Sequence, residues 1–411
     1  MKKIKFLIPE LVSPAGDWPS LRSAIDAGAD AVYFGIKELN MRSAAENFDK
    51  LETGKVISLL HQNGKKGYLT LNTIVYDREI AKAKKVLRQA KDCGVDAVIA
   101  WDMGVLELAR GTGIPVHLST QASVANFPSV KLFSSLGIKR IVLARECSLA
   151  DIKDIVAKIK GQGLDCQIEV FIHGAMCVSI SGRCLFSQHF FGKSANRGEC
   201  FQPCRREYLI KDVARGEEYV LGKDYVLSAK DLCTIDFIDQ LIESGISAFK
   251  IEGRMRSPEY TQVVTSVYRQ AIDAFFKGKL NAALKNNLRK KLETVFNRGF
   301  GTGFYLGQPR DIGSPQGLHG YEKIFLGEVT NFYNRISVAE VLLRNGSVSL
   351  GEEILIFGKS TAATFSKISE LQIKHQAVKN ARKGDLVGIK LGSTVRPKDK
   401  VFLWRKKQAV V

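Results

Sequence analysis

The chain has 411 residues, a formal net charge of +19 at pH 7, 45% hydrophobic residues and 25% charged residues. This composition is typical of a soluble globular enzyme or binding protein, and the length predicts two or three domains. The sequence excludes a membrane-spanning protein, because no stretch of it approaches the roughly 20 consecutive apolar residues of a spanning helix. Pro9 and Glu10 interrupt the first apolar run, which excludes a signal peptide and predicts a cytoplasmic protein with reduced cysteines.

The positive charge predicts a polyanionic partner. Lys and Arg side chains that neutralise phosphates supply most of the non-specific affinity for nucleic acid. An anionic membrane surface would also require an amphipathic helix of the membrane-binding kind, and we find none in the sequence. A basic surface without a partner remains the alternative.

Short apolar runs alternate with amphipathic segments up to about residue 255, which is the pattern of a parallel sheet. Eight strands in this order favour an α/β fold, a (β/α)8 TIM-like barrel, over an open sheet. The expected strands are Leu11 to Ala15, Ala31 to Gly35, Gly67 to Asn72, Ala97 to Trp101, Val116 to Ser119, Arg140 to Ala144, Gln167 to His173 and Ser247 to Glu252.

Polar residues follow several of these strands at their carboxyl ends, where barrel enzymes place their active sites. Lys250, Glu252 and Arg254 alternate with Ile251 and Gly253, so we expect their side chains on one side, at the barrel mouth. A salt-bridged lysine and glutamate that only fill the mouth is the alternative for any one residue. Glu169, Phe171 and His173 alternate in the same way, and the other exits carry Asn72, Gln121 and Arg145.

The connection between the last two strands is long, and we assign residues 174–245 to an insertion. It carries the clustered Cys177, Cys184, Cys200, Cys204 and Cys233 and a predicted hairpin from 208 to 221. Thiolates are soft ligands that suit zinc or an iron-sulfur cluster. Their spacing fits neither a zinc ribbon nor a ferredoxin run, so the pattern predicts a metal site without naming the metal.

The barrel with its insertion takes residues 1–256, and the rest of the chain predicts two further parts. Residues 257–305 form a helical extension containing two predicted helices. Residues 306–411 show alternating strand patterns with Gly and Asn turns, which predict a small all-β barrel domain. The sequence contains no P-loop, no HExxH, no GxSxG and no strand followed by GxGxxG, so hydrolase motifs give no support for hydrolysis.

The stretch EVFIHGAMCVSISGRCLFS resembles the signature of the collagenase-like peptidase family, number 32 among the peptidases of unknown catalytic type. Phe186 stands where an aliphatic residue is expected. The resemblance also covers SPAGD, LSTQAS and SAKDLC through KIEGRMRSPEY, and so most of residues 10 to 275. The matching positions are Glu169, Phe171, Gly174, Ala175, Met176, Cys177, Gly182, Cys184 and Ser187.

The resemblance implies a [4Fe-4S] cluster, because similar members of the family carry one on four cysteines. Matched by motif, the metal ligands are Cys177, Cys184, Cys200 and Cys204. Cys233 remains the alternative for the fourth ligand. Members of this kind are RNA hydroxylases or partners in quinone hydroxylation.

A basic C-terminal domain and this length look most like the tRNA branch. That branch installs a 5-hydroxyl on the wobble uridine of the anticodon loop, with prephenate as oxygen donor. The resemblance thus implies tRNA and prephenate as partners, with neither DNA nor a membrane. The alternatives are a collagenase-like peptidase, a ribosomal-RNA hydroxylase and a non-catalytic RNA-binding module.

We therefore expect two groups of site residues at the mouth. The candidates for catalysis are Lys250, Glu252, His173 and Glu169, with Glu252 or His173 as a proton shuttle at C5 of the base. Cations suit the two carboxylates of prephenate, since they form charge-assisted hydrogen bonds. The candidates for substrate binding are Arg254, Arg256, Arg145, Gln121 and Asn72.

Overall fold

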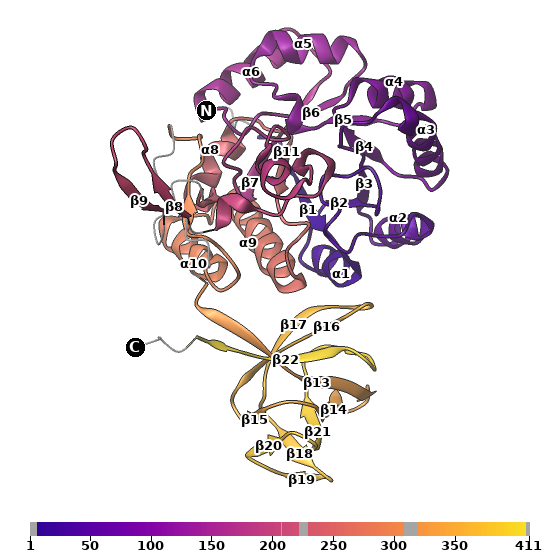
Figure 1. The fold of residues 1–411 in the computed structure, drawn as a ribbon. Helices are drawn as coiled ribbons and strands as arrows, with labels where there is room; N and C mark the ends of the chain where they lie inside the picture. The colour runs from indigo at the N-terminus through magenta and orange to yellow at the C-terminus, as the bar shows by residue number, and fades with distance from the viewer. Residues whose placement is uncertain (1–5, 207, 222–228, 308–318, 408–411) are drawn as a thin grey trace.

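The computed structural model describes residues 6–206, 208–221, 229–307 and 319–407. Figure 1 shows a larger part containing a ring of strands surrounded by helices, and below it a smaller part made of strands. The predicted α/β class and the all-β character of the C-terminal region are both confirmed.

Eight parallel strands form the closed barrel. Strands consecutive in the barrel pair with one another, and the last strand pairs with both the first and the seventh, which closes the ring. All eight predicted strands are present within one to two residues of their expected bounds, so the TIM-like barrel is confirmed. The strands are β1 (Glu10–Ala15), β2 (Ala31–Gly35), β3 (Lys66–Thr70), β4 (Ala97–Ala100), β5 (Val116–Leu118), β6 (Arg140–Val142), β7 (Gln167–Gly174) and β11 (Ala248–Ile251).

Helices surround the barrel, and capping residues in the sequence mark where they begin. Before α1, the Asp17 side chain accepts a hydrogen bond from the Ser20 amide at 2.7 Å, which satisfies one of the free donors of the first turn. The helices are α1 (Trp18–Asp26), α2 (Thr53–Gln62), α3 (Asp77–Asp92), α4 (Met103–Thr112), α5 (Phe127–Ser135), α6 (Leu149–Gly161), α8 (Ile238–Glu243), α9 (Pro258–Phe276) and α10 (Ala282–Leu292). Helices α9 and α10 are the two helices expected between 257 and 297.

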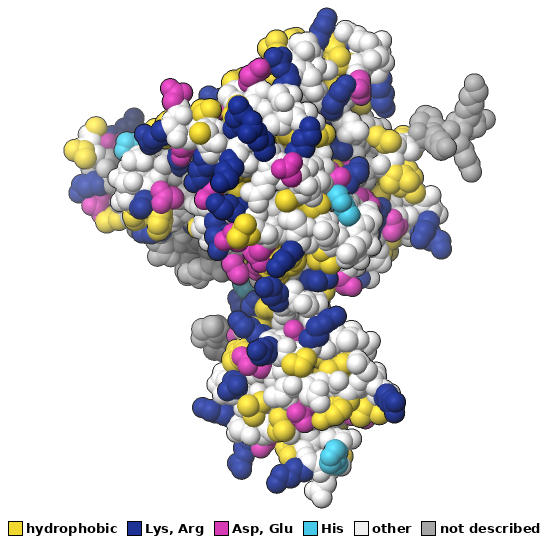
Figure 2. Space-filling view, turned by 90° about the vertical axis from the view of Figure 1, so that its right-hand side faces the viewer, with side chains coloured by type: hydrophobic (Ala, Val, Ile, Leu, Met, Phe, Trp, Pro, Cys, Tyr) yellow, Lys and Arg dark blue, Asp and Glu magenta, His cyan; other side chains and the backbone are white. Residues whose placement is uncertain are grey.

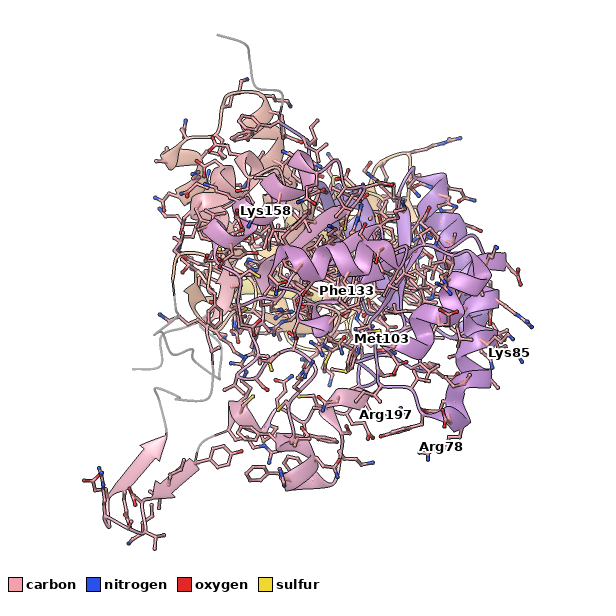
Figure 3. The ribbon with its side chains drawn as sticks, turned by 90° about the horizontal axis from the view of Figure 1, so that it is seen from above. Arg78, Lys85, Met103, Phe133, Lys158 and Arg197 are labelled. Atoms are coloured by element: carbon pink, nitrogen blue, oxygen red, sulfur yellow. The ribbon has the colours of Figure 1, made fainter. Side chains whose placement is uncertain are left out.

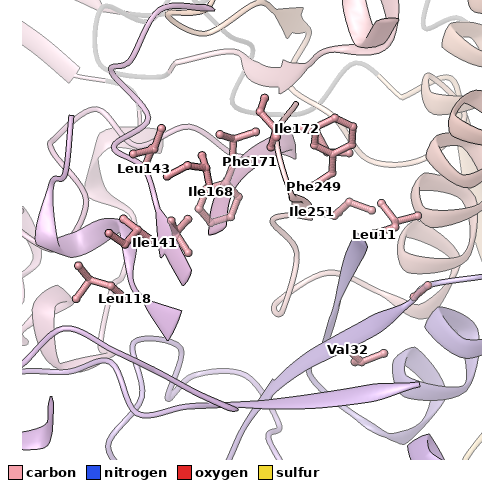
Figure 4. Packing of buried hydrophobic residues seen from close by; sticks show 14 of the residues in the cluster. Leu11, Val32, Leu118, Ile141, Leu143, Ile168, Phe171, Ile172, Phe249 and Ile251 are labelled. Atoms are coloured by element: carbon pink, nitrogen blue, oxygen red, sulfur yellow. The ribbon is translucent and has the colours of Figure 1, made fainter. Parts of the chain in front are cut away.

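The main hydrophobic core lies between the barrel strands and these helices. Leu11, Ile141 and Phe249 are completely buried in it, and Figure 4 shows their packing with neighbouring strand residues. Each such side chain stabilises the fold by about 1.5–3 kcal/mol relative to an exposed one.

The insertion after β7 contains a short helix and a hairpin. Helix α7 (Phe186–Phe191) is followed by the antiparallel pair β8 (Tyr208–Lys211) and β9 (Glu218–Leu221), which confirms the predicted hairpin. The chain returns to the barrel at β10 (Asp231–Cys233), which pairs antiparallel with β7 and parallel with β12 (Phe300–Gly301).

The C-terminal region forms an eight-stranded antiparallel sheet with a hydrophobic core of its own. In sheet order its strands are β17 (Thr361–Lys367), β16 (Glu353–Gly358), β22 (Lys400–Lys406), β13 (Tyr321–Tyr333), β14 (Val338–Leu343), β21 (Leu386–Lys390), β18 (Leu371–Ile373) and β19 (Gln376–Ala377). A separate pair joins β15 (Ser347–Ser349) to β20 (Asn380–Arg382).

This β region packs against the barrel through α1, α9 and β17. The Ala363 amide donates to the Ser23 hydroxyl at 2.9 Å, and the Lys323 ammonium lies 2.8 Å from Glu259. No helix within the described ranges is both long and apolar enough to cross a membrane.

Candidate functional site

A cavity of about 270 Å³ lies at the carboxyl ends of the barrel strands, between the barrel and the insertion. Among the described residues that line it, seven are Lys or Arg and one, Glu252, is acidic. A cavity of this charge attracts anions strongly, because its low-dielectric walls screen charge less than water does. The seven cations are Arg42, Arg145, Arg205, Lys250, Arg254, Arg256 and Arg298.

Lys250 forms part of the cavity floor and is held by a chain of opposite charges inside the barrel. Its ammonium lies 2.8 Å from Glu169, and Glu169 also lies 3.5 Å from Arg140, which pairs with Glu10. Lys250 is 4% exposed and Glu169 is completely buried. Glu169 does not line the cavity, so it acts below the floor by compensating the two cations.

The same cations and carboxylates shift one another's protonation. Burial alone would lower the pKa of Arg140, but Glu169 and Glu10 raise it above its ordinary value. Lys250 also lies 4.4 Å from the ring centroid of Tyr33, a favourable cation–π distance. Burial raises the pKa of Tyr33 well above its ordinary value, so this phenol stays neutral.

Glu252 lies between two arginines. Its carboxylate is 3.4 Å from Arg42 and 3.2 Å from Arg145. Burial would raise the pKa of Glu252, but Arg42, Arg145, Arg254 and Lys250 together lower it to about 2. A carboxylate this acidic is a weak base at neutral pH, so the geometry favours Glu252 as the group that positions the two arginines.

Arg254 is buried at the mouth with neutral partners. It donates to the hydroxyl of Thr70 at 2.8 Å and to the side-chain oxygen of Asn40 at 3.2 Å. Burial lowers the pKa of Arg254 to about 10. Gly35 is needed beside it, because a Cβ there would lie 2.3 Å from the Arg254 guanidinium.

Arg256 lies at the side of the cavity next to β10. Asp231 lies 3.4 Å from both Arg256 and Arg298, so its single negative charge is shared between two positive charges. On the opposite side, Asn72 donates to the side-chain oxygen of Gln121 at 3.0 Å, and the Gln121 amide donates to the Asn72 carbonyl at 3.0 Å. These two residues form a polar, uncharged wall, as their positions at strand exits predict.

His173 does not lie in the cavity, which corrects the expectation that it shares a face with Glu169 and Phe171. Lys250 pairs with Phe171, but the next residue, Ile251, pairs with His173, so β7 contains one extra residue at this point. Such a bulge turns the following side chain to the other face. His173 is therefore buried outside the barrel, 3.3 Å from the Tyr268 hydroxyl, and burial lowers its pKa to about 3.

Four of the clustered cysteines, Cys177, Cys184, Cys200 and Cys204, all line the cavity. Burial raises the pKa of Cys204, and nearby Cys177, Cys200 and Cys184 raise it further against the opposing effect of Arg205. Cys233 lies elsewhere: it is buried against Tyr268, and its sulfur is 3.9 Å from that hydroxyl. Among the described residues no three His, Cys, Asp or Glu side chains already surround one metal position, so the thiols share a cavity without forming a closed site.

The insertion is tied to the loops of the barrel mouth. Arg197 donates to both carboxylate oxygens of Glu79, at 2.8 and 2.6 Å, and to the Ile74 carbonyl. Figure 3 shows Arg197 at this rim, next to Arg78. Gly198 has a φ of +98°, and a Cβ there would lie 2.5 Å from the Asn40 carbonyl. A larger residue at this position would push the cysteine-bearing loop off the mouth.

Sequence reasoning missed Arg42 and Tyr33. Arg42 comes from the long loop between β2 and α2, whose residues show no periodicity, so its approach to Glu252 has no signal in the sequence. Tyr33 lies within β2, and its ring faces the Lys250 ammonium. The alternation of side chains along β2, together with its pairing to β1, could have predicted that Tyr33 faces into the barrel.

The fold and the site define a TIM-like barrel whose cationic mouth is covered by a thiol-bearing insertion. The chain belongs to peptidase family U32, whose family model matches residues 16–314.

Three similar proteins have different names. The chain is 42% identical to "Uncharacterized protease MJ0090" of Methanocaldococcus jannaschii, over 97% of this chain and 98% of that protein. It is 38% identical to a protein of Porphyromonas gingivalis named "Collagenase", with 97% and 98% covered. It is 35% identical to "tRNA hydroxylation protein P1" of Bacillus subtilis, with 85% and 83% covered.

Replacing Glu252 by Gln should destabilise the protein at neutral pH. Because the folded protein lowers the pKa of Glu252 from 4.5 to about 2, its ionised form stabilises the fold above pH 4.5, by about 3 kcal/mol. This contribution is lost as the pH falls from 4.5 towards 2. Urea unfolding should show a gap between the wild type and Glu252→Gln that narrows over this range.

The exposed Glu107, paired with Arg110 on the surface, provides the matched control. Glu107→Gln should change the free energy of unfolding by less than about 1 kcal/mol, both at neutral pH and as the pH falls from 4.5 towards 2. A gap for Glu252→Gln that is independent of pH would contradict the electrostatic role of the carboxylate.

Proposed function

We propose that this protein is an RNA hydroxylase that forms 5-hydroxyuridine at the wobble position of tRNA, with prephenate as the oxygen donor. The observation that carries the proposal is the single cavity in which seven cations and four thiols meet. The similarity to a protein named for tRNA hydroxylation supports the RNA substrate.

The cations of the cavity suit a small dianion such as prephenate. Lys250 and Arg254 come from the carboxyl end of β11 and Arg145 from that of β6, and all three line one cavity of about 270 Å³. Guanidinium groups bind carboxylates through paired hydrogen bonds, and burial strengthens each of them. Glu252 is the one acidic residue in the described lining, and Glu169, which lies outside the lining, pairs with Lys250 at 2.8 Å.

The target base would enter from the open side of the cavity. A wobble uridine lies in a loop and is unpaired, so placing it in a pocket requires only its unstacking, which costs a few kcal/mol. Asn72 and Gln121 offer amide groups that match the polar edge of a pyrimidine. Their mutual hydrogen bonds hold these amides in fixed positions.

Cys177, Cys184, Cys200 and Cys204 fit a [4Fe-4S] cluster in number and in chemistry, since each cluster of this type takes four thiolates. Such a cluster supplies one-electron transfer to the site. Binding would draw the cysteine-bearing segments of the insertion together, since metal sites of this kind form along with the local fold. Cys233 is buried within β10 and does not line the cavity, which supports leaving it out of the set.

The lining of the cavity does not favour the peptidase alternative, although two of the similar proteins are named as a protease and a collagenase. The described lining of the cavity includes no histidine, so none of its cysteines has the partner that activates a peptidase nucleophile. Its one carboxylate is held by two arginines and is a poor base. A ribosomal-RNA substrate would use the same chemistry, and the nucleoside measurement below separates it from tRNA.

Lys250→Met should lower the modification at least tenfold while leaving the cluster in place. Lys250 lies in β11 and not in the insertion that carries the cysteines, so its loss removes a carboxylate-binding cation of the lining. Because the change also leaves Glu169 without its partner at 2.8 Å, the amount of folded protein is measured beside the cluster. The measurement is mass spectrometry of tRNA nucleosides from a strain lacking the gene and complemented with each variant. We expect at least a tenfold loss of 5-hydroxyuridine, the effect of losing about 1.4 kcal/mol of transition-state stabilisation.

The matched control is Lys158→Met, since Lys158 is exposed on α6 and pairs only with Asp154 within the described residues. It should restore the modification fully. Equal restoration by Lys250→Met would contradict the role of Lys250 in the cavity floor. Loss of a modified nucleoside from ribosomal RNA alone would identify ribosomal RNA, and not tRNA, as the substrate.

Cys204→Ser should lower the iron content of anaerobically purified protein, whereas Cys233→Ser should leave it unchanged. Cys204 shares the cavity with the three other thiols, and Cys233 does not. Iron and acid-labile sulfide are measured per protein. The opposite pattern, with iron lost only from Cys233→Ser, would show that the ligand set is wrong.

A further inference from the structure

The insertion exposes a continuous group of aromatic side chains beside the cavity. We call these residues the aromatic face: Phe186, Phe190, Phe191, Phe201 and Tyr208. Phe190 is 57% exposed and Phe201 is 52% exposed. Neighbouring ring centroids are 5.5 to 6.4 Å apart, so the rings form one connected surface.

Exposing so many rings is unfavourable in water, and contiguous apolar surface of this kind marks an interaction site. The aromatic face borders the reaction space directly. Phe186 itself lines the cavity, and Phe201 follows Cys200, which also lines it. A molecule bound on these rings would therefore touch whatever occupies the cavity.

The surroundings of the aromatic face are cationic. Residues 183–206 contain five Lys or Arg and one acidic residue, Glu199, which lies 3.3 Å from Lys193. The guanidinium of Arg206 lies 4.6 Å from the Phe191 ring centroid. Protein interfaces are depleted of charge at their centres, whereas single-stranded nucleic acid is bound by aromatic rings within a basic groove.

The positive charge continues away from the cavity along the rim. Arg197 and Arg78 lie 4.8 and 4.9 Å from the ring of Tyr76, and Figure 3 shows them side by side at the edge of the barrel. Helix α3 follows, with exposed Lys82, Lys84, Lys85, Arg88 and Lys91. Figure 2 shows Lys and Arg side chains gathered on this side of the barrel.

We propose that the aromatic face stacks the unpaired bases that flank the target base in an RNA loop, with the basic rim and α3 holding the phosphates of the adjoining stem. This inference rests on the proposed function and adds the surface that selects a loop over a duplex. Rings bind any base face, so the target base itself is still selected inside the cavity.

The test measures binding of anaerobically purified protein to a short anticodon stem-loop RNA with 2-aminopurine at one loop position. The double variant Phe190→Ala with Phe201→Ala should weaken binding by roughly tenfold or more, since stacking on a ring is worth about 1–3 kcal/mol per base. It should also abolish the fluorescence change of 2-aminopurine. The salt dependence of binding should stay the same, because no phosphate contact is removed.

Three further variants separate stacking from other causes. Phe276→Ala removes a ring that is 37% exposed on α9, outside the insertion, and should bind like the wild type. Phe190→Trp keeps a ring face and should retain affinity, whereas Phe190→Leu keeps only the apolar character and should lose it. Iron content is measured for each variant, so that damage to the cysteine loops is detected.

The outcomes separate this inference from the proposed function. Wild-type affinity in the double variant, with 5-hydroxyuridine still formed in cells, overturns the aromatic face alone. No binding of the stem-loop by the wild type, together with no modification in cells, overturns both. A dimer of the wild type that the double variant dissolves would identify the aromatic face as a contact between copies and overturn its role with RNA.

Discussion

A chain of alternating charges inside the barrel underlies the whole site. Glu10, Arg140, Glu169 and Lys250 follow one another from one end of the barrel to the mouth, each next to a group of opposite sign. A charge buried without a partner costs several kcal/mol, and removing one member of a buried pair is strongly destabilising. These alternating charges therefore allow the almost completely buried ammonium group of Lys250 to form part of the cavity floor.

The mouth extends this arrangement with an excess of cations. Glu252 and Asp231 each serve two arginines, so the described carboxylates organise the cations without neutralising all of them. The surplus charge favours an anionic ligand in the cavity. The insertion contributes four thiols to the lining of the cavity and carries the aromatic face beside it, so the cavity and the proposed RNA-binding surface share one segment.

The barrel could be predicted from the sequence because the spacing of apolar residues, and the polar residues that follow each strand, are local patterns. The sequence located Lys250, Glu252, Arg254, Asn72, Gln121 and Arg145 at the mouth for the same reason. It failed for His173, because the extra residue between the pairs of Phe171 and His173 reverses the face without any local signal. It also left Cys204 and Cys233 as alternatives, since only the return of β10 to the barrel separates them in space.

Reconstitution with purified components shows whether this cavity transfers oxygen to an RNA base, as we propose. Purified protein with its cluster is incubated with unmodified tRNA and prephenate carrying heavy oxygen, and the nucleosides are analysed by mass spectrometry. We expect 5-hydroxyuridine with the heavy oxygen incorporated. Absence of any hydroxylated nucleoside, with cluster and tRNA binding intact, would contradict it.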